Sequence, residues 1–394
     1  MGALRRSHPG YLSPGGGVLI PGLEGARVAL VHDWLTGMRG GEKALEPICR
    51  ALPDADLFTL VHVPGSVSPV IESRRVHTSL VQRMPAVGRY YRQYLPLFPL
   101  AIERFDFSGF DVVVSFSHCV AKSVITPPGV PHLCYCFTPM RYAWDQFDAY
   151  FGPERVGRPA SALLRPVMNR IARWDAATST RPSRYLAISQ YVAGRIRRYY
   201  NREATVAYPP VDTDFYRPDA TPPGRHFLIV SALVPYKRIE LAIDACRRLG
   251  VPLRIVGAGP ERTALERYAN GSAMFLGRLP DDEVRREYRE AAAVILPGEE
   301  DFGIVPVEAQ ACGRPVVALG RGGALETVID GVTGVFASEP TVDAMADALE
   351  RVTRLPVDVA VIRRHAETFS TTAYLEAFCA ALSETVAAPA GTRW

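Results

Sequence analysis

The sequence lacks three features that would indicate a specialised class of protein. No apolar run reaches the roughly 20 residues that a membrane-spanning helix needs. The formal net charge is only +4 over 394 residues, which gives no reason to expect a nucleic-acid partner. No sustained apolar segment follows Arg5 and Arg6, so we expect no signal peptide and a soluble protein of the cytoplasm.

The cysteines are few and unpaired. There are seven of them, an odd number without the ligand spacing of a zinc site. Their apolar contexts predict buried free thiols. Cys134 and Cys136 would share one face of a strand, and a metal or redox role for them is the minor hypothesis. We therefore expect neither a metal nor a cofactor.

The length and the patterning predict two domains. A chain of 394 residues with 48% hydrophobic content can form two separate cores. Residues 1–25 are rich in proline and glycine and predict a disordered tail. Strand-like and helix-like runs then alternate, which predicts α/β domains with parallel, doubly wound sheets. Prolines after residue 208 indicate a linker, so we expect domains at 26–213 and 214–370 and a final helix in 371–394 that crosses back to the first domain.

The most informative stretch is Glu300–Gly313. It follows the apolar run 291–296, which resembles a buried parallel strand, and it becomes compatible with a helix after residue 303. The backbone N–H groups of residues 302–304 would then lie at the positive end of a helix dipole, where a diphosphate could bind. Glu300 and Glu308 bracket this position, although two solvated glutamates at this spacing are also common.

Two strand ends in the first half also carry candidate residues. A glycine-rich turn containing Gly40 and Gly41 separates the first predicted strand, 26–33, from the first predicted helix. A tight turn without a ligand would explain these glycines equally well. His118 follows the predicted strand 111–117, at the edge where α/β proteins form their sites.

In the second half, Lys237 and Arg238 follow the predicted strand 226–233 and stand where the next helix is expected to begin. Basic side chains are unfavourable at a helix start, so their presence there favours an anionic ligand nearby.

Residues 83–104 combine four arginines with tyrosine, leucine and phenylalanine. This mixture suits the surface of an anionic membrane or a lipid-diphosphate acceptor, but it also fits an ordinary packed helical segment. Pro96 and Pro99 exclude one long amphipathic helix.

These patterns together resemble the retaining glycosyltransferases of family 4, whose signature is two glutamates separated by seven residues, usually with Phe-Gly between them. Segments 32–35, 40–43 and 137–144 are similar to bacterial polysaccharide and O-antigen mannosyltransferases. The resemblance covers nearly the whole chain after residue 26. It implies a GT-B fold, with an acceptor-binding and a donor-binding Rossmann-like domain facing a central cleft.

The resemblance also implies roles for single residues. Glu300 would contact the donor sugar, Glu308 the ribose and Lys237 the donor phosphates, with His118 near the donor sugar or the acceptor. The further implied donor contacts are Arg238, Phe302, Gly303, Ile304, Gly40, Gly41, Arg278 and Gly323, and Arg141 is implied on the acceptor side.

Two positions depart from the family pattern. Ala232 stands where the family often has an arginine on the donor phosphates, and Phe137 stands where many relatives have histidine. The similarity to mannosyltransferases favours GDP-mannose as the donor, with a UDP-sugar second, and a lipid-linked saccharide as the acceptor. Two further hypotheses are a nucleotide-sugar epimerase of the same architecture and a non-catalytic subunit that binds a sugar nucleotide.

Overall fold

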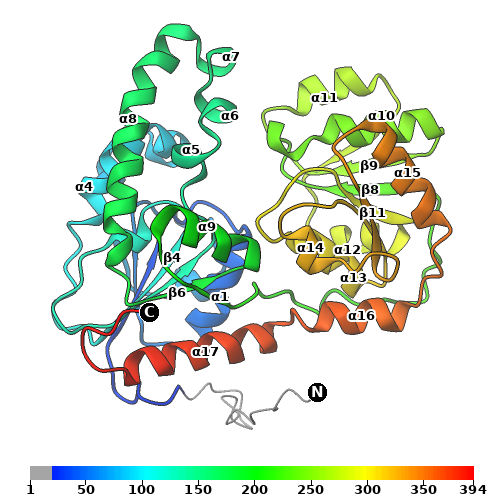
Figure 1. Ribbon diagram of the computed structural model, residues 1–394. Coiled ribbons are helices and arrows are strands. Elements are labelled where there is room, and N and C mark those ends of the chain that lie inside the picture. The colour runs from blue at the N-terminus through cyan, green and yellow to red at the C-terminus, as the bar shows by residue number, and fades with distance from the viewer. Residues whose placement is uncertain (1–19) are drawn as a thin grey trace. The chain divides into compact units, whose positions relative to one another are not determined.

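The computed structural model describes residues 20–394, and the chain divides into two compact units. The first unit contains residues 20–188, Val192–Ala207 and Thr372–Trp394, and the second contains Ser189–Tyr191 and Tyr208–Thr371. Figure 1 shows a sheet flanked by helices in each unit. Within the described residues no helix has both the length and the apolar character needed to cross a membrane.

The first unit is built on a seven-stranded parallel sheet in the order β3-β2-β1-β4-β5-β6-β7. Its central strands are buried along their whole length, as expected for a parallel sheet covered on both faces. The strands are β1 (Val28–His32), β2 (Asp56–Thr59), β3 (Val76–Thr78), β4 (Val112–Ser117), β5 (His132–Cys136), β6 (Arg184–Ala187) and β7 (Thr205–Val206).

Helices and short helical turns connect these strands. They are α1 (Gly40–Ala51), α2 (Pro69–Glu72), η1 (Leu80–Arg83), α3 (Val87–Tyr90), η2 (Tyr91–Leu97), α4 (Phe98–Ile102), η3 (Ala121–Ser123), α5 (Arg141–Trp144), α6 (Phe147–Phe151), α7 (Pro153–Val156), α8 (Arg158–Ala177), η4 (Thr178–Thr180), α9 (Gln190–Tyr200) and the C-terminal α17 (Thr371–Ala387). The prolines divide residues 83–104 into short pieces, as the sequence predicts.

The second unit is built on a six-stranded parallel sheet in the order β10-β9-β8-β11-β12-β13. Its strands are β8 (Phe227–Val230), β9 (Leu253–Val256), β10 (Met274–Gly277), β11 (Ala293–Leu296), β12 (Val316–Leu319) and β13 (Gly334–Ala337). Its helical elements are η5 (Pro235–Lys237), α10 (Ile239–Leu249), α11 (Arg262–Ala269), α12 (Asp281–Glu290), α13 (Ile304–Ala311), α14 (Ala324–Thr327), α15 (Val342–Thr353) and α16 (Val359–Glu367).

The predicted fold class, α/β with two doubly wound parallel sheets, is confirmed. The helix start expected at Lys237 and Arg238 is confirmed to within about one residue. Lys237 ends the short turn η5, and Arg238, with a left-handed φ of 51°, is the N-cap of α10. The sequence pattern of residues 204–211 also predicts a strand, but the structure has only the two residues of β7 there, since Pro209 and Pro210 cannot donate to a ladder.

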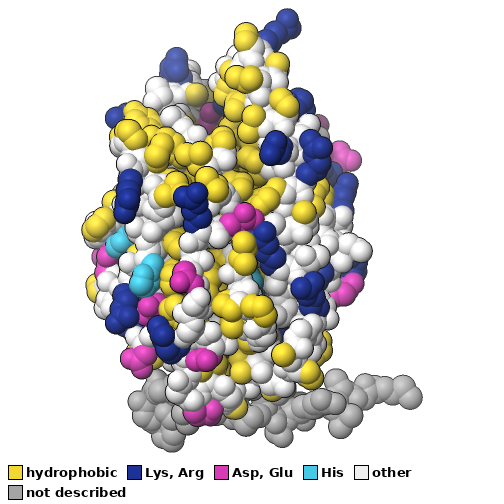
Figure 2. All heavy atoms as spheres, turned by 90° about the vertical axis from the view of Figure 1, so that its left-hand side faces the viewer, with side chains coloured by type: hydrophobic (Ala, Val, Ile, Leu, Met, Phe, Trp, Pro, Cys, Tyr) yellow, Lys and Arg dark blue, Asp and Glu magenta, His cyan; other side chains and the backbone are white. Residues whose placement is uncertain are grey.

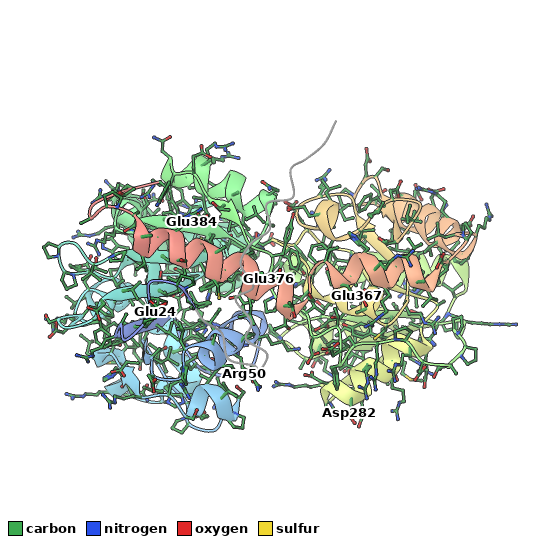
Figure 3. All side chains as sticks on the ribbon, turned by 90° about the horizontal axis from the view of Figure 1, so that it is seen from below. Glu24, Arg50, Asp282, Glu367, Glu376 and Glu384 are labelled. Carbon is green, nitrogen blue, oxygen red and sulfur yellow. The ribbon has the colours of Figure 1, made fainter. Side chains whose placement is uncertain are left out.

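Helix α17 packs on the first unit. The Tyr374 hydroxyl donates to the carbonyl of Ala44 on α1 (2.9 Å), and Glu384 forms an ion pair with Arg184 of β6 (2.6 Å). Figure 3 shows Glu376 and Glu384 along this helix. The Ser383 hydroxyl donates to the carbonyl of Pro21 (2.8 Å), so the last residues of the predicted tail lie against α17, while residues 1–19 fall outside the described part.

The seven cysteines are all buried and none is in a disulfide, which confirms the prediction of free buried thiols.

A buried ion pair joins several elements of the first unit. Lys122, in η3, lies 3.0 Å from the Asp175 carboxylate of α8, and its side chain is 1% exposed. The same carboxylate accepts hydrogen bonds from the indole N–H of Trp144 (2.8 Å) and the hydroxyl of Tyr200 (2.9 Å). Burying two charges is costly, and these additional hydrogen bonds offset part of the cost.

Replacing one partner of this pair should therefore be severe. We predict that Lys122→Met lowers the free energy of unfolding by about 3–5 kcal/mol, because it leaves the Asp175 charge buried without a counter-charge. Urea denaturation measures the loss. Arg50→Met is the control, since the Arg50–Glu46 pair is exposed and worth less than about 1 kcal/mol. Equal losses in the two variants would contradict the prediction.

Candidate active site

Each sheet reverses its strand order once, and the candidate residues gather at these two reversals. In the first sheet the order reverses between β1 and β4, and in the second between β8 and β11. At such a point the loops that follow the two neighbouring strands turn to opposite faces, so the carboxyl edge of the sheet is open to a ligand. The loops after β1, β4, β8 and β11 are therefore the places to examine.

At the second reversal Lys237 and Glu300 form an ion pair. Lys237 comes from the loop after β8, and Glu300 comes from the loop after β11, 63 residues later. Their side chains are 17% and 16% exposed, so both are sheltered and both still reach the surface. The structure thus brings together the residues that the sequence analysis assigns to the donor sugar, Glu300, and to the donor phosphates, Lys237.

Glycines allow the loops around this pair to pack backbone to backbone. A Cβ at Gly298 would lie 2.7 Å from the carbonyl oxygen of Tyr236, and a Cβ at Gly323 would lie 2.3 Å from Cα of Phe302. The N–H of Gly323 also donates to the carbonyl of Glu300 (2.8 Å). Any side chain at these glycines would push apart the loops that hold Lys237 and Glu300.

Helix α13 begins directly after this loop. Gly303 occupies its N-cap with φ of 90°, a conformation that favours glycine, and as a glycine it has no side chain of its own to cap the helix. The first-turn N–H groups of a helix attract anions, so this end fits the predicted diphosphate contact of Gly303 and Ile304. The Phe302 ring is buried against Tyr208 and Phe369, which leaves its backbone as the part that could meet a ligand.

Glu308, the second glutamate of the pair, lies one to two turns into α13 and is buried. Its carboxylate accepts a hydrogen bond from the Tyr288 hydroxyl of α12 (2.8 Å). Burial, with the nearby Glu308 charge, raises the pKa of Tyr288 well above its usual value, so this hydroxyl keeps its proton and remains a donor. The sequence analysis missed Tyr288, because nothing in its local pattern indicates a contact 20 residues away.

The remaining predicted donor residues of this unit are more exposed. Arg238 follows Lys237 on the surface, and Arg278 is exposed directly after β10. Ala232 is also exposed, in the loop after β8 where the family often has an arginine. Lys237 is thus the cation that the structure places at the reversal.

At the first reversal a buried carboxylate organises the turn after β4. Asp33 follows β1, is fully buried, and accepts hydrogen bonds of 2.7–2.9 Å from four consecutive backbone N–H groups, those of residues 118–121. Carboxylates bound to several N–H groups are strongly stabilised. Sequence reasoning missed this role, although an aspartate at the end of the first strand was a signal that could have indicated it.

His118 is held by the same carboxylate. Its Nδ1 lies 3.1 Å from Asp33, and the edge of its ring contacts Trp34 with 4.3 Å between ring centroids. Burial lowers the pKa of His118, and the Asp33 charge opposes that shift. The side chain is still 29% exposed, so His118 is oriented and accessible at the carboxyl edge of the sheet, where the sequence predicts it.

Gly41 lies beside another histidine of this edge. His32 is fully buried, its Nδ1 lies 3.0 Å from the Trp34 carbonyl, and its Nε2 has no partner among the described residues. A Cβ at Gly41 would lie 3.2 Å from that Nε2 and 3.5 Å from the Phe137 ring. Glycine here lets the first turn of α1 approach both rings.

Arg141, the predicted acceptor contact, begins the short helix α5 and is partly exposed. Two contacts hold this helix in place. The Tyr142 hydroxyl lies 2.6 Å from the sulfur of Cys119, which follows His118, and the indole N–H of Trp144 donates to the Asp175 carboxylate. The position of Arg141 therefore depends on the buried network of Lys122 and Asp175.

The described residues contain no group of three or more histidine, cysteine, aspartate or glutamate side chains that could hold a metal ion.

Two family models match the chain, one in each unit. The model described as Glycosyltransferase Family 4 matches residues 38–215, and the model described as Glycosyl transferases group 1 matches residues 218–369. Together they account for most of the sequence. The chain belongs to glycosyltransferase family 4.

The curated relatives that the chain matches are also named as glycosyltransferases. A GDP-mannose-dependent alpha-(1-6)-phosphatidylinositol monomannoside mannosyltransferase of Mycolicibacterium smegmatis is 33% identical over 227 residues, which are 50% of this chain and 58% of that protein. An uncharacterized glycosyltransferase of Methanocaldococcus jannaschii is 28% identical over 166 residues, 41% of this chain and 47% of that protein. This family-4 chain thus spans about half the length of the curated relatives it matches.

Solved structures share the fold at low identity. The Anabaena protein Alr3699/HepE, crystallised with UDP, aligns with a TM-score of 0.67 and 16% identity over 91% of this chain and all of that one. WaaG, a glycosyltransferase involved in lipopolysaccharide biosynthesis, aligns with a TM-score of 0.59 and 16% identity over 91% of this chain and 99% of that one. The family-4 chain therefore has the GT-B fold, as the sequence predicts.

Asp33 gives the first prediction for this site. Asp33→Asn should lower the free energy of unfolding by about 2–4 kcal/mol, because an amide has one acceptor oxygen for four N–H groups. It should also lower the pKa of His118, since the Asp33 charge raises it. Chemical denaturation and an NMR titration of the His118 ring measure the two effects. An unchanged His118 titration in the folded variant would contradict the assigned contact.

The burial of His32 predicts a loss of stability in acid. Burial lowers the pKa of His32 to about 4, whereas the unfolded chain binds that proton near pH 6.5. Its contribution is therefore complete above pH 6.5 and is lost as the pH falls towards 4, on the order of 3 kcal/mol in total. We predict that wild-type protein loses this much more than His32→Asn when the free energy of unfolding is compared at pH 7 and pH 4. Parallel losses in both proteins would refute the prediction.

Proposed function

We propose that this protein is a retaining glycosyltransferase that moves mannose from GDP-mannose onto a lipid-linked saccharide during synthesis of a cell-surface polysaccharide. The observation that carries the proposal is the Lys237–Glu300 pair at the strand-order reversal, next to the start of α13, whose N-cap is Gly303. It combines a cation and helix N–H groups for a diphosphate with a carboxylate for the hydroxyls of a sugar.

In this mechanism negative charge develops on the diphosphate as the bond to the sugar breaks. Lys237, the exposed Arg238 and the N–H groups at the start of α13 stabilise that charge, without a requirement for a metal. Each helix-end contribution is only about 0.3–2 kcal/mol, so water exclusion and positioning supply much of the remaining rate enhancement.

Glu300 also prepares Lys237 for the donor. The ion pair holds the ammonium group at the reversal before a ligand arrives, so less conformational entropy is lost on binding. An arriving diphosphate competes with Glu300 for the ammonium group and leaves the carboxylate to accept hydrogen bonds from sugar hydroxyls. The pair is sheltered but not buried, which keeps the energetic cost of this exchange low.

Glu308 is proposed to bind the ribose. Tyr288 donates to one carboxylate oxygen and so fixes the orientation of the group. A carboxylate can bind two neighbouring hydroxyls at once, as carboxylates do in other nucleotide sites. Arg278, exposed at the end of β10, is proposed to contact the base.

The first unit is proposed to bind the acceptor. His118 is oriented by Asp33 and exposed at the carboxyl edge of its sheet, next to the close approach of Gly41 to His32 and Phe137. Gly40, Gly41 and Arg141 complete the set of proposed contacts there. We expect the acceptor hydroxyl to attack the sugar from the same face that the diphosphate leaves, because the proposed site includes no side chain assigned as a nucleophile that would attack the sugar first.

The choice of mannose rests on a relative. The M. smegmatis protein is named as a GDP-mannose-dependent mannosyltransferase, and the 33% identity covers half of this chain. A UDP-sugar donor is the second candidate. An epimerase would release a free sugar without an acceptor, so product analysis separates it from a transferase.

Nucleotide binding tests the proposal directly. We predict that GDP, at about 100 times its dissociation constant, stabilises the protein by about 2.7 kcal/mol in thermal unfolding, while UDP and ADP at the same concentration do not. Lys237→Ala should lose most of this stabilisation, because Lys237 is the cation placed at the reversal. Arg267→Ala, an exposed arginine on α11, is the matched control and should behave as wild type.

Stabilisation by UDP alone would keep the fold and the glutamate roles but overturn GDP-mannose. No stabilisation by any nucleotide would favour a non-catalytic protein. A full GDP response in Lys237→Ala would move the phosphate site elsewhere.

A further inference from the structure

All the charged side chains on the outer face of α8 are arginines. Arg158, Arg165, Arg170 and Arg173 are all exposed, and at about 100° per residue they fall within roughly 140° of the helix circumference. The one acid in α8, Asp175, is on the opposite, buried face with Lys122. In a chain with a net charge of only +4, this is a local concentration of positive charge.

This face adjoins residues 83–104, the basic and aromatic segment noted in the sequence. The indole N–H of Trp174, on α8, donates to the carboxylate of Glu103 (2.9 Å), which directly follows α4. Glu103 is the one acid in 83–104, and Arg181 forms an ion pair with it (2.7 Å). The other charged residues of that segment are exposed arginines, namely Arg83, Arg89, Arg92 and Arg104.

Most of these arginines have no carboxylate partner. Arg165 pairs with Asp148 (2.8 Å), but Arg170 and Arg173 form no ion pair with any described residue. The same holds for Arg89 and Arg92, whose guanidinium groups lie over tyrosine rings. Their charge is therefore available to an external anion.

Apolar side chains are exposed among the arginines. Leu163 on α8 is 72% exposed, and Leu100 and Tyr90 are exposed in the adjoining segment. Figure 2 views this side of the molecule, and yellow and dark blue side chains intermingle over its upper part, with few magenta ones between them. Exposed leucines and tyrosines next to arginines are typical of surfaces that lie in the headgroup region of a bilayer.

We propose that the outer face of α8, together with the exposed residues of 83–104, is a docking surface for an anionic lipid membrane. Arginines bind the lipid phosphates, and Leu163 and Leu100 enter the boundary with the acyl chains. A nucleic acid or a soluble polyanion would satisfy the arginines but offers no apolar phase to the leucines. The inference goes beyond the proposed function, since it holds for any donor and any reaction.

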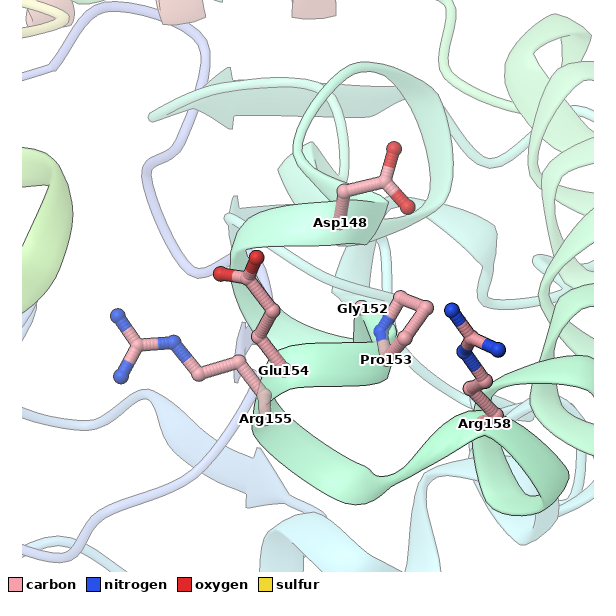
Figure 4. A pocket seen from close by; sticks show the side chains of 6 residues that line it. All are labelled: Asp148, Gly152, Pro153, Glu154, Arg155 and Arg158. Atoms are coloured by element: carbon pink, nitrogen blue, oxygen red, sulfur yellow. The ribbon is translucent and has the colours of Figure 1, made fainter.

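The hollow at the start of α8 is a less suitable place for a lipid headgroup. It has a volume of about 620 Å³ and is lined by residues of α6, α7 and α8 (Figure 4). Asp148 and Glu154 line it together with Arg155 and Arg158, so its charge is mixed. The substitutions that test the surface are therefore placed farther along the helix, at Arg170 and Arg173.

Vesicle sedimentation tests the proposal with the full chain. Wild-type protein should bind phosphatidylglycerol-containing vesicles and not vesicles of phosphatidylcholine alone, and the binding should fall as the salt is raised to about 0.5 M. Each arginine removed should weaken the affinity for anionic vesicles about fivefold, so R170Q/R173Q should bind about 25-fold more weakly than wild type. R267Q/R286Q removes two exposed arginines of α11 and α12 and should bind as wild type.

A second variant, Leu163→Ser, leaves the charge unchanged and should weaken binding in high salt, where the apolar contacts dominate. Circular dichroism and thermal unfolding confirm that each variant is folded. Failure of the wild-type protein to bind anionic vesicles, equal binding to neutral ones, or equal losses in R170Q/R173Q and R267Q/R286Q would each overturn the proposal. Because no nucleotide takes part, failure here is distinct from failure of the proposed function.

Discussion

The reversal of strand order in each parallel sheet is the constraint on which the rest of the structure depends. Parallel strands need long crossover connections of one hand, so a sheet that grows in both directions from its first strand sends neighbouring loops to opposite faces. The reversals lie between β1 and β4 and between β8 and β11. They bring Asp33 to the backbone of His118, 85 residues later, and Lys237 to Glu300, 63 residues later. The same topology, used twice, creates both groups of candidate residues.

The two reversals use a carboxylate in different ways, and burial separates the roles. Asp33 is inaccessible and fully committed to four backbone N–H groups and to His118, so it acts by positioning other groups. Glu300 pairs with Lys237 and remains partly exposed, so in the proposed mechanism a diphosphate can take its place beside that lysine. The buried pair of Lys122 and Asp175 also acts by positioning other groups. Its hydrogen bonds connect η3, α5, α8 and α9 of the first unit, near His118 and Arg141.

The proposed chemistry and the proposed membrane surface place different demands on charge. At the second reversal a single lysine, one helix start and small residues suffice, because the site is sheltered and electrostatic interactions there are strong. On the outer face of α8 several exposed arginines are required, because each is screened by water and salt. Both arrangements fit a chain whose overall charge is nearly balanced. A lipid-linked acceptor would join the two, since its reactive end must be presented close to a bilayer.

The sequence by itself determined the α/β class, the positions of most strands, the helix after Gly303 and the spacing of Glu300 and Glu308, because these follow from local periodicity, turn residues and a contiguous motif. It also placed a helix start at Lys237 and Arg238, and α10 begins directly after Arg238, although nothing local signals the left-handed conformation of that residue. Only the tertiary structure decided that Lys237 pairs with Glu300 and that Tyr288 donates to Glu308. It also decided that Asp33 binds the backbone at His118, and that the exposed arginines of α8 lie beside residues 83–104. Those facts depend on which distant strands and helices pack together, and that packing is set by burial and chain topology over the whole unit.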